Sequence, residues 1–450
     1  MALAGITVTL SAQSGAPAHY VVQDLGQADG VSSTATSIND NGVVAGWIQT
    51  VGHGTRAARA VDGGIFQYVP GLETASAANG INAIGQLTGY VASTTSPGDL
   101  HAMRYTDGLV EDLGSFGGNS FAYGINRHGQ VAGWSFTPGF FTTRAFVATP
   151  GQPLLDLGNL GGGAQPMTFA SGINDAGQVA GHSVTNTGRW HAFRYAPGVG
   201  LQDLGTPSDA DSFAERINAS GQVVGRLASA AGTHAFRFTD GAGMQDLHTI
   251  AAAASSWAFD INDAGAVVGM LFTAGAPHAL LYTDADGMID LNTRIDPASG
   301  WVLTAALGVN NAGEIVGMGT YRDQVSPRAF KLTPQPVDTT PPVIAAVAAN
   351  PSVLWPANRE MRSVTITVDV TDNLDPSPQC RVTAVTSNEP VDDAAITVTG
   401  ALTLSLRADR DASGSGRAYH VAVTCSDASG NTAGTTVDVG VPHDMSGGTP

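Results

Sequence analysis

The chain of 450 residues has little of several residue types, with one lysine, six glutamates and two cysteines. Lysine and glutamate are good helix formers, so their scarcity beside 57 glycines favours strands joined by turns over helices. Hydrophobic residues make up 43% of the chain and charged residues 13%, which is enough apolar material for a sizeable core. We therefore expect a globular all-β protein of two or three domains.

Positive charge is scarce as well, because 20 lysines and arginines stand against 38 aspartates and glutamates, a formal net charge of −18. Such a chain repels the phosphates of nucleic acids and anionic lipid headgroups, and no cluster of arginines forms a local exception. We expect no nucleic-acid partner. The many aspartates have two interpretations: they end strands and build turns, or some of them bind calcium.

Long apolar runs are missing, since no segment approaches the roughly 18 to 20 residues that span a bilayer, and we expect no membrane span. Residues 1–18 contain an apolar stretch followed by small residues suited to signal cleavage, but they lack the positively charged start of an export signal. These residues are either a truncated signal peptide or a disordered leader.

The common catalytic signatures are also missing, namely GxSxG, HExxH, the P-loop and the Rossmann fingerprint. The two cysteines, Cys380 and Cys425, form no CxxC pair, which disfavours redox catalysis and a zinc site. A disulfide between them would close a loop of about 46 residues, which the chain-entropy model values at roughly 4 kcal/mol. Such a bond requires an oxidising compartment.

Repetition is what the sequence has in abundance. The motif GINRHGQVAGW, residues 124–134, recurs with variations in seven copies spaced 43 to 48 residues apart. Its asparagines are Asn39, Asn82, Asn126, Asn174, Asn218, Asn262 and Asn310. Two further motifs keep step with it, one of the type HAFRY, as in residues 191–195, and one an Asp-Leu pair, as at Asp203. The whole unit therefore repeats.

Each unit holds four short apolar runs bounded by Gly, Pro and Asn, which predict four antiparallel strands. Four strands in about 44 residues match one blade of a β-propeller. The array begins with an Asp-Leu strand, residues 20–25, and ends with a HAF-type strand, residues 328–332, so each end supplies what the other lacks. We predict a seven-bladed β-propeller over residues 19–333 that is closed by its N-terminal strand.

The repeats resemble bacterial extracellular repeats of the HAF family, on the HAF tripeptides at His191 and His234 and over roughly residues 20 to 333. This resemblance implies a propeller-like fold in a secreted or cell-surface protein. It implies no activity and supplies no catalytic residues.

The repeated polar residues have structural interpretations. Asn126 and Gly129 bracket a turn whose middle residues differ from copy to copy, so the turn is scaffold and His128 is a solvated turn residue. The first HAF position holds His or Arg, which share the ability to donate hydrogen bonds to a carboxylate. We predict that this residue pairs with the Asp of the following strand as a cross-strand or diagonal neighbour: His101 with Asp112, Arg144 with Asp156, His191 with Asp203, His234 with Asp246, His278 with Asp290 and, by ring closure, Arg328 with Asp24.

Function in a repeat scaffold is expected where the copies differ. The residue after the second motif glycine is such a position, and Met270 and Met318 occupy it in the last two copies. Aromatic and cationic side chains there suit a sugar ring or a peptide, or they pack between blades. The candidate ligand-binding residues are Trp47, Tyr90, Trp134, His182 and Arg226.

From Asp338 the repeat stops, and we assign residues 334–342 to a Pro-rich linker, 343–441 to a domain and 442–450 to a flexible tail. About seven strongly alternating segments predict a β-sandwich. The segment resembles bacterial immunoglobulin-like and hyalin-repeat-like modules, notably in DTTPP and CSDASGN, which implies an adhesive or spacer module. Candidate calcium ligands lie near its strand ends: Asp338, Asp372, Asp375, Asp427 and Asn431.

These observations favour a non-catalytic binding or interaction protein that is secreted or at the cell surface. We expect it to be a monomer without a cofactor other than calcium, and its ligand to be a glycan or a protein. The alternative is an extracellular polysaccharide-directed hydrolase or lyase built from scattered loop residues. A deep channel lined by two or more unpaired carboxylates near a histidine would favour the enzyme.

Overall fold

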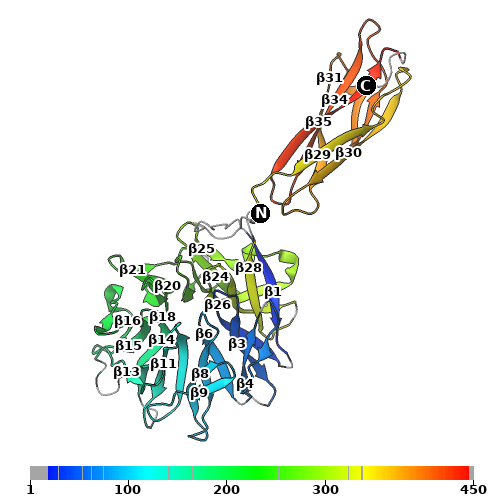
Figure 1. Cartoon of the computed structure of the whole chain (residues 1–450). Helices are drawn as coiled ribbons and strands as arrows, with labels where there is room; N and C mark the ends of the chain where they lie inside the picture. The colour runs from blue at the N-terminus through cyan, green and yellow to red at the C-terminus, as the bar shows by residue number, and fades with distance from the viewer. Residues whose placement is uncertain are drawn as a thin grey trace, which may run out of the picture. The chain divides into compact units, whose positions relative to one another are not determined.

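The computed structural model describes residues 19–444 except positions 29, 53, 62, 74, 140–141, 162, 164–165, 252, 323 and 336–337. The predicted leader and the end of the predicted tail, residues 445–450, lie outside the described residues. The chain divides into two compact units, Met1–Gln335 and Pro336–Pro450. Both are built from strands, with no α-helix among the described residues, so the all-β prediction is confirmed (Figure 1).

The strands of the first unit form seven four-stranded antiparallel sheets, which we number 1 to 7 along the chain. Sheets 1 to 6 each take four consecutive strands. Sheet 1 contains β2 (Ser32–Ile38), β3 (Val44–Thr50), β4 (Gly54–Ala60) and β5 (Gln67–Tyr68), and sheet 2 contains β6 (Ser76–Ile81), β7 (Leu87–Ala92), β8 (Leu100–Thr106) and β9 (Leu109–Asp112). Sheet 3 contains β10 (Ser120–Ile125), β11 (Val131–Phe136), β12 (Thr143–Ala148) and β13 (Leu155–Asp156), and sheet 4 contains β14 (Thr168–Ile173), β15 (Val179–Val184), β16 (Trp190–Ala196) and β17 (Gly200–Asp203). Sheet 5 contains β18 (Ser212–Ile217), β19 (Val223–Ser229), β20 (Gly232–Thr239) and β21 (Gly243–Asp246), and sheet 6 contains β22 (Ser255–Ile261), β23 (Val267–Phe272), β24 (Pro277–Thr283) and β25 (Gly287–Asp290).

Sheet 7 joins the two ends of the array. It contains β26 (Trp301–Val309), β27 (Ile315–Tyr321) and β28 (Arg328–Pro334), and its fourth strand is β1 (Tyr20–Gly26), the first described strand of the chain. The register places Tyr20 opposite Pro334. The strand that has no sheet of its own at the start of the array thus completes the last sheet, and the edge of β28 is covered.

The HAF motif is explained by packing inside each sheet. In sheet 3, Phe146 lies directly opposite Gly133 in the neighbouring strand and is fully buried. A Cβ atom at Gly133 would lie 2.9 Å from the Phe146 ring, so the glycine leaves the space that the ring fills. Hydrophobic clusters then bridge successive sheets, as where Ala132 and Val147 pack with Phe193 of sheet 4.

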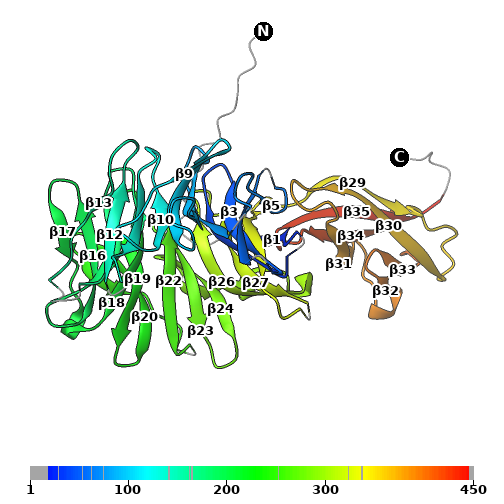
Figure 2. The same ribbon diagram turned by 90° about the horizontal axis from the view of Figure 1, so that it is seen from below.

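The second unit contains two sheets with a shared core, whose strands are labelled in Figure 2. One sheet has the order β29 (Val343–Asn350), β30 (Met361–Thr371), β33 (Thr403–Arg407) and β32 (Ile396–Gly400), and the other β31 (Gln379–Ser387), β34 (Gly416–Ser426) and β35 (Thr432–Pro442). Cys380 and Cys425 lie opposite each other in β31 and β34 and form a disulfide, so that prediction is confirmed.

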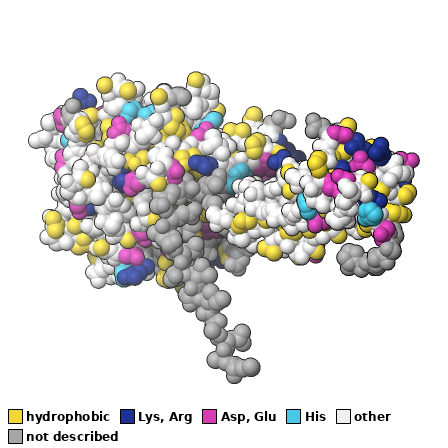
Figure 3. All heavy atoms as spheres, turned by 90° about the horizontal axis from the view of Figure 1, so that it is seen from above, with side chains coloured by type: hydrophobic (Ala, Val, Ile, Leu, Met, Phe, Trp, Pro, Cys, Tyr) yellow, Lys and Arg dark blue, Asp and Glu magenta, His cyan; other side chains and the backbone are white. Residues whose placement is uncertain are grey.

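Short 3-10 helices complete the described elements: Pro207–Asp209, Leu291–Arg294, Pro297–Ser299 and Asp393–Ala395. None of the helices in the described ranges is long and apolar enough to cross a membrane. On the face shown in Figure 3, acidic and basic side chains are interspersed with uncharged surface. The net charge of −18 is therefore not gathered into one acidic patch on that face.

Candidate functional site

The asparagine that opens each N-x-x-G turn is buried and binds in two directions. In sheet 3, Asn126 Oδ1 accepts hydrogen bonds from the backbone N–H groups of His128, at 3.1 Å, and Gln130, at 3.0 Å. Asn126 Nδ2 donates to the main-chain oxygen of Asn174 in sheet 4, at 3.0 Å. The residue therefore holds its own turn and also ties its sheet to the next one.

The bonds between sheets form a closed ring. Each asparagine Nδ2 donates to the main-chain oxygen of the next asparagine, at 2.9 to 3.1 Å, and the last bond runs from Asn310 back to Asn39. The seven turns surround a hollow of about 220 Å³, the asparagine mouth, which all seven copies line. The sequence suggested the bonds inside the turn but not those between sheets.

The residue after the asparagine was treated above as free to vary, and the structure corrects this. Where it is Asp, its carboxylate accepts the N–H of the equivalent residue in the preceding sheet: Asp175 from Arg127, Asp263 from Ala219 and Asp40 from Asn311, each at 2.9 Å. His128, the next residue of the turn in sheet 3, is exposed as expected. The two middle positions of the turn therefore differ in role.

The pairs between the HAF-type strand and the Asp-Leu strand are present in all six cases. The nitrogen-to-oxygen distances are 2.9 Å for His101 and Asp112, 2.7 Å for Arg144 and Asp156, 2.9 Å for His191 and Asp203, 2.7 Å for His234 and Asp246, 2.6 Å for His278 and Asp290, and 2.7 Å for Arg328 and Asp24. The same carboxylates also accept a backbone N–H two residues on, as Asp112 does from Gly114. Each of these carboxylates therefore accepts hydrogen bonds from a side chain and from the backbone, and its role is structural.

Four buried cations form a contact that the sequence analysis missed. Arg104 Nη1, for example, donates at 2.6 Å to the main-chain oxygen of Gly129, the turn glycine of the next sheet. The signal was a cation at the fourth position of the HAF motif, which five units carry, Arg59 of the first unit included. Among the described residues, the contact joins Arg104 to Gly129, Arg194 to Gly221, Arg237 to Gly265 and Lys331 to Gly42.

The candidate ligand-binding residues lie on the second strand of each sheet and are half-buried. Trp134 lies between two rings, with centroid distances of 4.8 Å to Phe121 in its own sheet and 5.0 Å to Phe169 in the next. Such ring contacts, mostly edge-to-face, continue over sheets 2 to 6 and end in cation–π contacts of Arg226. We call this set the aromatic band: Tyr90, Phe121, Trp134, Phe169, His182, Phe213, Arg226 and Trp257. Packing between sheets and partial exposure are therefore combined in the same side chains.

Trp47 and the two methionines stand outside the band. Trp47 is half-buried at the equivalent position of sheet 1, where Ala77 replaces the phenylalanine of the next sheet. Met318 accepts a hydrogen bond from the Thr34 hydroxyl, at 3.8 Å. The band is thus confined to one side of the array, because only sheets 3 to 6 have an aromatic residue at the facing position of the first strand.

Arg226 of the band and three charged side chains next to the band lie on sheets 5 and 6. Arg226 Nη1 contacts Glu215 Oε1 at 2.5 Å, and Arg216 Nε lies 3.8 Å from Asp260 Oδ1. Burial raises the pKa of both carboxyl groups. Burial and the charge of Arg226 lower the pKa of His182 to about 4, so this imidazole is neutral at neutral pH. Each carboxylate has an arginine beside it, so the unpaired carboxylates that would favour an enzyme are not found among these four groups.

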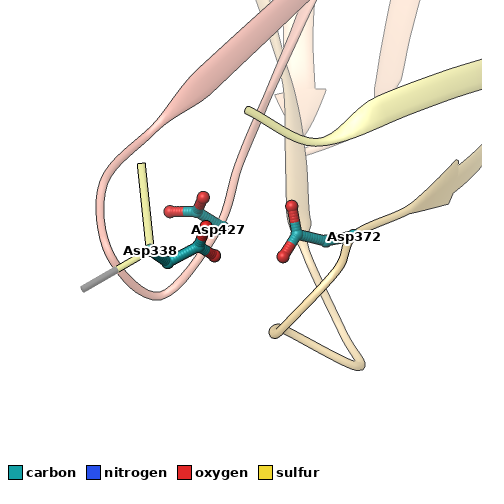
Figure 4. Close-up of side chains that lie close together, drawn as sticks. All are labelled: Asp338, Asp372 and Asp427. Atoms are coloured by element: carbon teal, nitrogen blue, oxygen red, sulfur yellow. The ribbon is translucent and has the colours of Figure 1, made fainter. Parts of the chain in front are cut away.

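The predicted calcium ligands of the second unit are brought together in part (Figure 4). One carboxylate oxygen from each of Asp338, Asp372 and Asp427 lies within 4.8 Å of the others, and we call these residues the acidic triad. Asn431 Nδ2 donates to Asp427 Oδ2 and to the main-chain oxygen of Asp338, so its amide oxygen is not what faces the triad. The Asp375 carboxylate instead accepts the N–H groups of nearby loops.

Comparisons with known proteins identify no family for this chain and show only distant structural similarity. No protein-family model and no curated protein sequence matches. TolB from Acinetobacter baumannii is 14% identical over 55% of this chain and 62% of its own, less than two thirds of its length, with a TM-score of 0.40. The BP39L lectin from Burkholderia pseudomallei is 10% identical over 68% of this chain and 98% of its own, with a TM-score of 0.38. An Aleuria aurantia lectin mutant in complex with Fucalpha1-6GlcNAc is 10% identical over 58% and 94%, with a TM-score of 0.33.

Proposed function

We propose that the chain is a non-catalytic binding protein, secreted or at the cell surface, whose ligand is a glycan or a protein. In this proposal the first unit is a seven-bladed β-propeller closed by β1, and the second is an immunoglobulin-like sandwich that acts as a spacer or attachment module. The return of the asparagine ring to Asn39 supports the closed propeller. The Cys380–Cys425 disulfide supports an oxidising compartment.

The aromatic band is the observation that carries the binding function. Its rings contact one another across five sheets, so they present aromatic faces that are already fixed before a ligand arrives. Trp and Tyr faces suit the C–H face of a sugar or an apolar peptide side chain, and the Arg226 guanidinium adds a charge-assisted donor. A band used for packing alone would have no need to stay half-exposed.

The alternative, a polysaccharide hydrolase or lyase, has weaker support. Glycoside hydrolysis usually needs two carboxyl groups that are free to act as acid and as base or nucleophile. Glu215 and Asp260 each lie beside an arginine, and Asp260 Oδ2 also accepts the N–H of Val309 at 2.9 Å. These contacts leave the two groups poorly placed for that chemistry.

A glycan array and a turnover screen on one preparation of the full chain test this function. We expect binding without turnover, and binding that falls at least about tenfold in Trp134→Ala. The matched control is Trp355→Ala, because Trp355 is 45% exposed and lies in the second unit. Turnover by the wild type would contradict the proposal, as would binding that the two variants lose equally.

We further propose that the acidic triad binds calcium. Asp338 and Asp427 are each only 7% exposed, and Asp372 Oδ2 is buried without a hydrogen-bond partner among the described residues. Two buried carboxylates and a half-buried one this close repel one another unless a cation or protons lie between them. Calcium takes six to eight oxygen ligands and uses carboxylates readily, so it fits this donor set.

Thermal unfolding with and without calcium tests this second function. If calcium at 100 times its dissociation constant binds only the folded unit, it stabilises that unit by about 2.7 kcal/mol. The stabilisation should disappear in Asp427→Asn and remain in Asp438→Asn, since Asp438 is 65% exposed and pairs with His420 instead. A chain that gains no stability from calcium would contradict the proposal.

A further inference from the structure

Beneath the asparagine mouth lies a collar of seven apolar side chains. Each belongs to the residue directly before a ring asparagine and is 5 to 9% exposed: Ile38, Ile81, Ile125, Ile173, Ile217, Ile261 and Val309. The collar lines the asparagine mouth on one side. On the other side most of the same residues line a second hollow of about 180 Å³, which we call the chamber.

The seven copies also differ in the residues that line the chamber. The residue two positions before the ring asparagine is glycine in four copies and serine in one, but it is Arg216 in sheet 5 and Asp260 in sheet 6. Glycine has a packing reason, because a Cβ at Gly124 would lie 2.8 Å from a backbone nitrogen of sheet 4. Two adjacent copies therefore place opposite charges where the scaffold favours no side chain at all.

Neighbouring backbone groups hold Arg216 in place while leaving part of it free. Its Nη1 donates to the main-chain oxygens of Ser171, at 2.6 Å, and Glu215, at 3.2 Å. Its Nη2 has no hydrogen bond to any residue that the structure describes. Asp260 accepts the N–H groups of Val309, at 2.9 Å, and Ile261, at 3.0 Å. The chamber thus has a fixed donor and a fixed acceptor on one wall.

Tyr123 adds a second donor and connects the chamber to the aromatic band. Tyr123 lines the chamber, and its hydroxyl oxygen is within reach of the Trp134 indole N–H. An indole N–H only donates, so the hydroxyl oxygen is the acceptor in this contact and its own hydrogen is left to donate elsewhere. Burial, aided by the charge of Glu215, raises the pKa of Tyr123, so the hydroxyl keeps that hydrogen.

We propose that the chamber binds one neutral polyhydroxylated ring, such as a single sugar residue. A hydroxyl group both donates and accepts, so a polyol satisfies Arg216, Tyr123 and Asp260 together. The Asp260 carboxylate would repel an anion, and the Arg216 guanidinium would repel a cation. An engineered cavity of about 150 Å³ accepts benzene, so a hollow of about 180 Å³ has room for one six-membered ring. The inference rests on the proposed binding function and gives it a second, deeper site.

The test is calorimetric titration of the full chain with glucose, galactose, mannose, N-acetylglucosamine and myo-inositol, with inorganic phosphate and calcium chloride as charged probes. We expect saturable binding of at least one neutral ring, weakened at least about tenfold by Tyr123→Phe, Asp260→Asn and Arg216→Gly. Arg216→Gly restores the residue that four other copies carry. Arg189→Gly is the matched control, because Arg189 is 56% exposed and 3.9 Å from Asp211.

Three outcomes would contradict the proposal that the chamber binds a neutral ring. They are equal binding in all variants, saturable binding of phosphate or calcium in place of every neutral ring, or no saturable binding of any probe at concentrations on the order of 1 mM. Tyr123→Phe keeps the ring and removes one oxygen, so it decides the matter even if Arg216→Gly fails to fold. If wild type and chamber variants bind a glycan array equally, the chamber is wrong and the function of the aromatic band stands. If the wild type binds no glycan on the array, the proposal of a glycan ligand for the aromatic band fails together with the chamber.

Discussion

The two sides of the apolar collar are built by opposite rules. At the asparagine mouth, seven copies supply the same side chain, and each bonds to the next until the ring returns to its start. Two residues earlier on the same strands, the copies supply glycine, serine, Arg216 or Asp260. Identical residues close the array because every interface then has the same geometry. Differing residues place charged side chains in the chamber on the other side of the collar.

Sheet 7, which contains both ends of the array, contacts sheet 1 through the same kinds of hydrogen bond that join other neighbouring sheets. Ser33 Oγ accepts the N–H of Ala329 at 2.9 Å, as Ser76 Oγ accepts that of Ala57 at 3.1 Å inside the array. Lys331 approaches the turn oxygen of Gly42 as the arginines approach theirs. The joint between the ends is thus made of contacts that recur at other joints, although its partners are about 290 residues apart.

The largest expected effect on stability comes from removing one asparagine of the ring at the asparagine mouth. Asn126→Ala removes the bonds to two backbone N–H groups and to Asn174, and it leaves buried groups without partners. We expect a loss of about 3 kcal/mol in the free energy of unfolding, measured by urea denaturation. Arg127→Ala is the control, since that side chain is 63% exposed. Equal losses in the two variants would show that the ring contributes little to stability.

A smaller effect on stability is expected at His182 of the aromatic band as the pH falls. His182 has a folded-state pKa of about 4 against an ordinary value of 6.5, so the unfolded chain binds its proton first. The stability that the neutral imidazole contributes is complete above pH 6.5 and is lost as the pH falls towards 4. Allowing for its partial exposure, we expect this loss to be about 2 kcal/mol.

Unfolding measurements from pH 7 to pH 4 on His182→Met check this expectation. Methionine occupies the equivalent position in sheets 6 and 7, so the substitution should pack, and the variant should lose less stability than the wild type as the pH falls. His128→Ala, at an exposed turn, serves as the control. The expectation is wrong if wild type and His182→Met lose stability in parallel.

The smallest effect concerns the joint between the chain ends. Double-mutant cycles to alanine on Arg328 and Asp24, and on Arg144 and Asp156, compare the same pair at the joint and inside sheet 3. Arg328 is 18% exposed and Arg144 is 53% exposed, so we expect a coupling of about 1 kcal/mol for the first pair and less for the second. A coupling near zero at the joint would show that the pair does not help to close the array.

Periodic positions could be read from the sequence because repetition multiplies their signal. The asparagine turns, the HAF-type strands and the pairing of Arg328 with Asp24 all follow from comparing seven copies. The chamber could not be found in this way, because it depends on which side chains converge across the channel. Arg216 and Tyr123 lie on sheets 5 and 3, and nothing in their local sequence states that they face one hollow.

The sequence by itself determined the class of fold, the number of repeated units, the strand that completes sheet 7 and the cysteines that pair. These follow from local patterns, since strand alternation, turn residues and repeat spacing are encoded within a few tens of residues. Only the tertiary structure decided that the asparagines bond between sheets and that Trp134 reaches Tyr123. It also decided that three of five suspected calcium ligands meet. Such contacts depend on how sheets pack against one another, and packing is settled by the whole core at once.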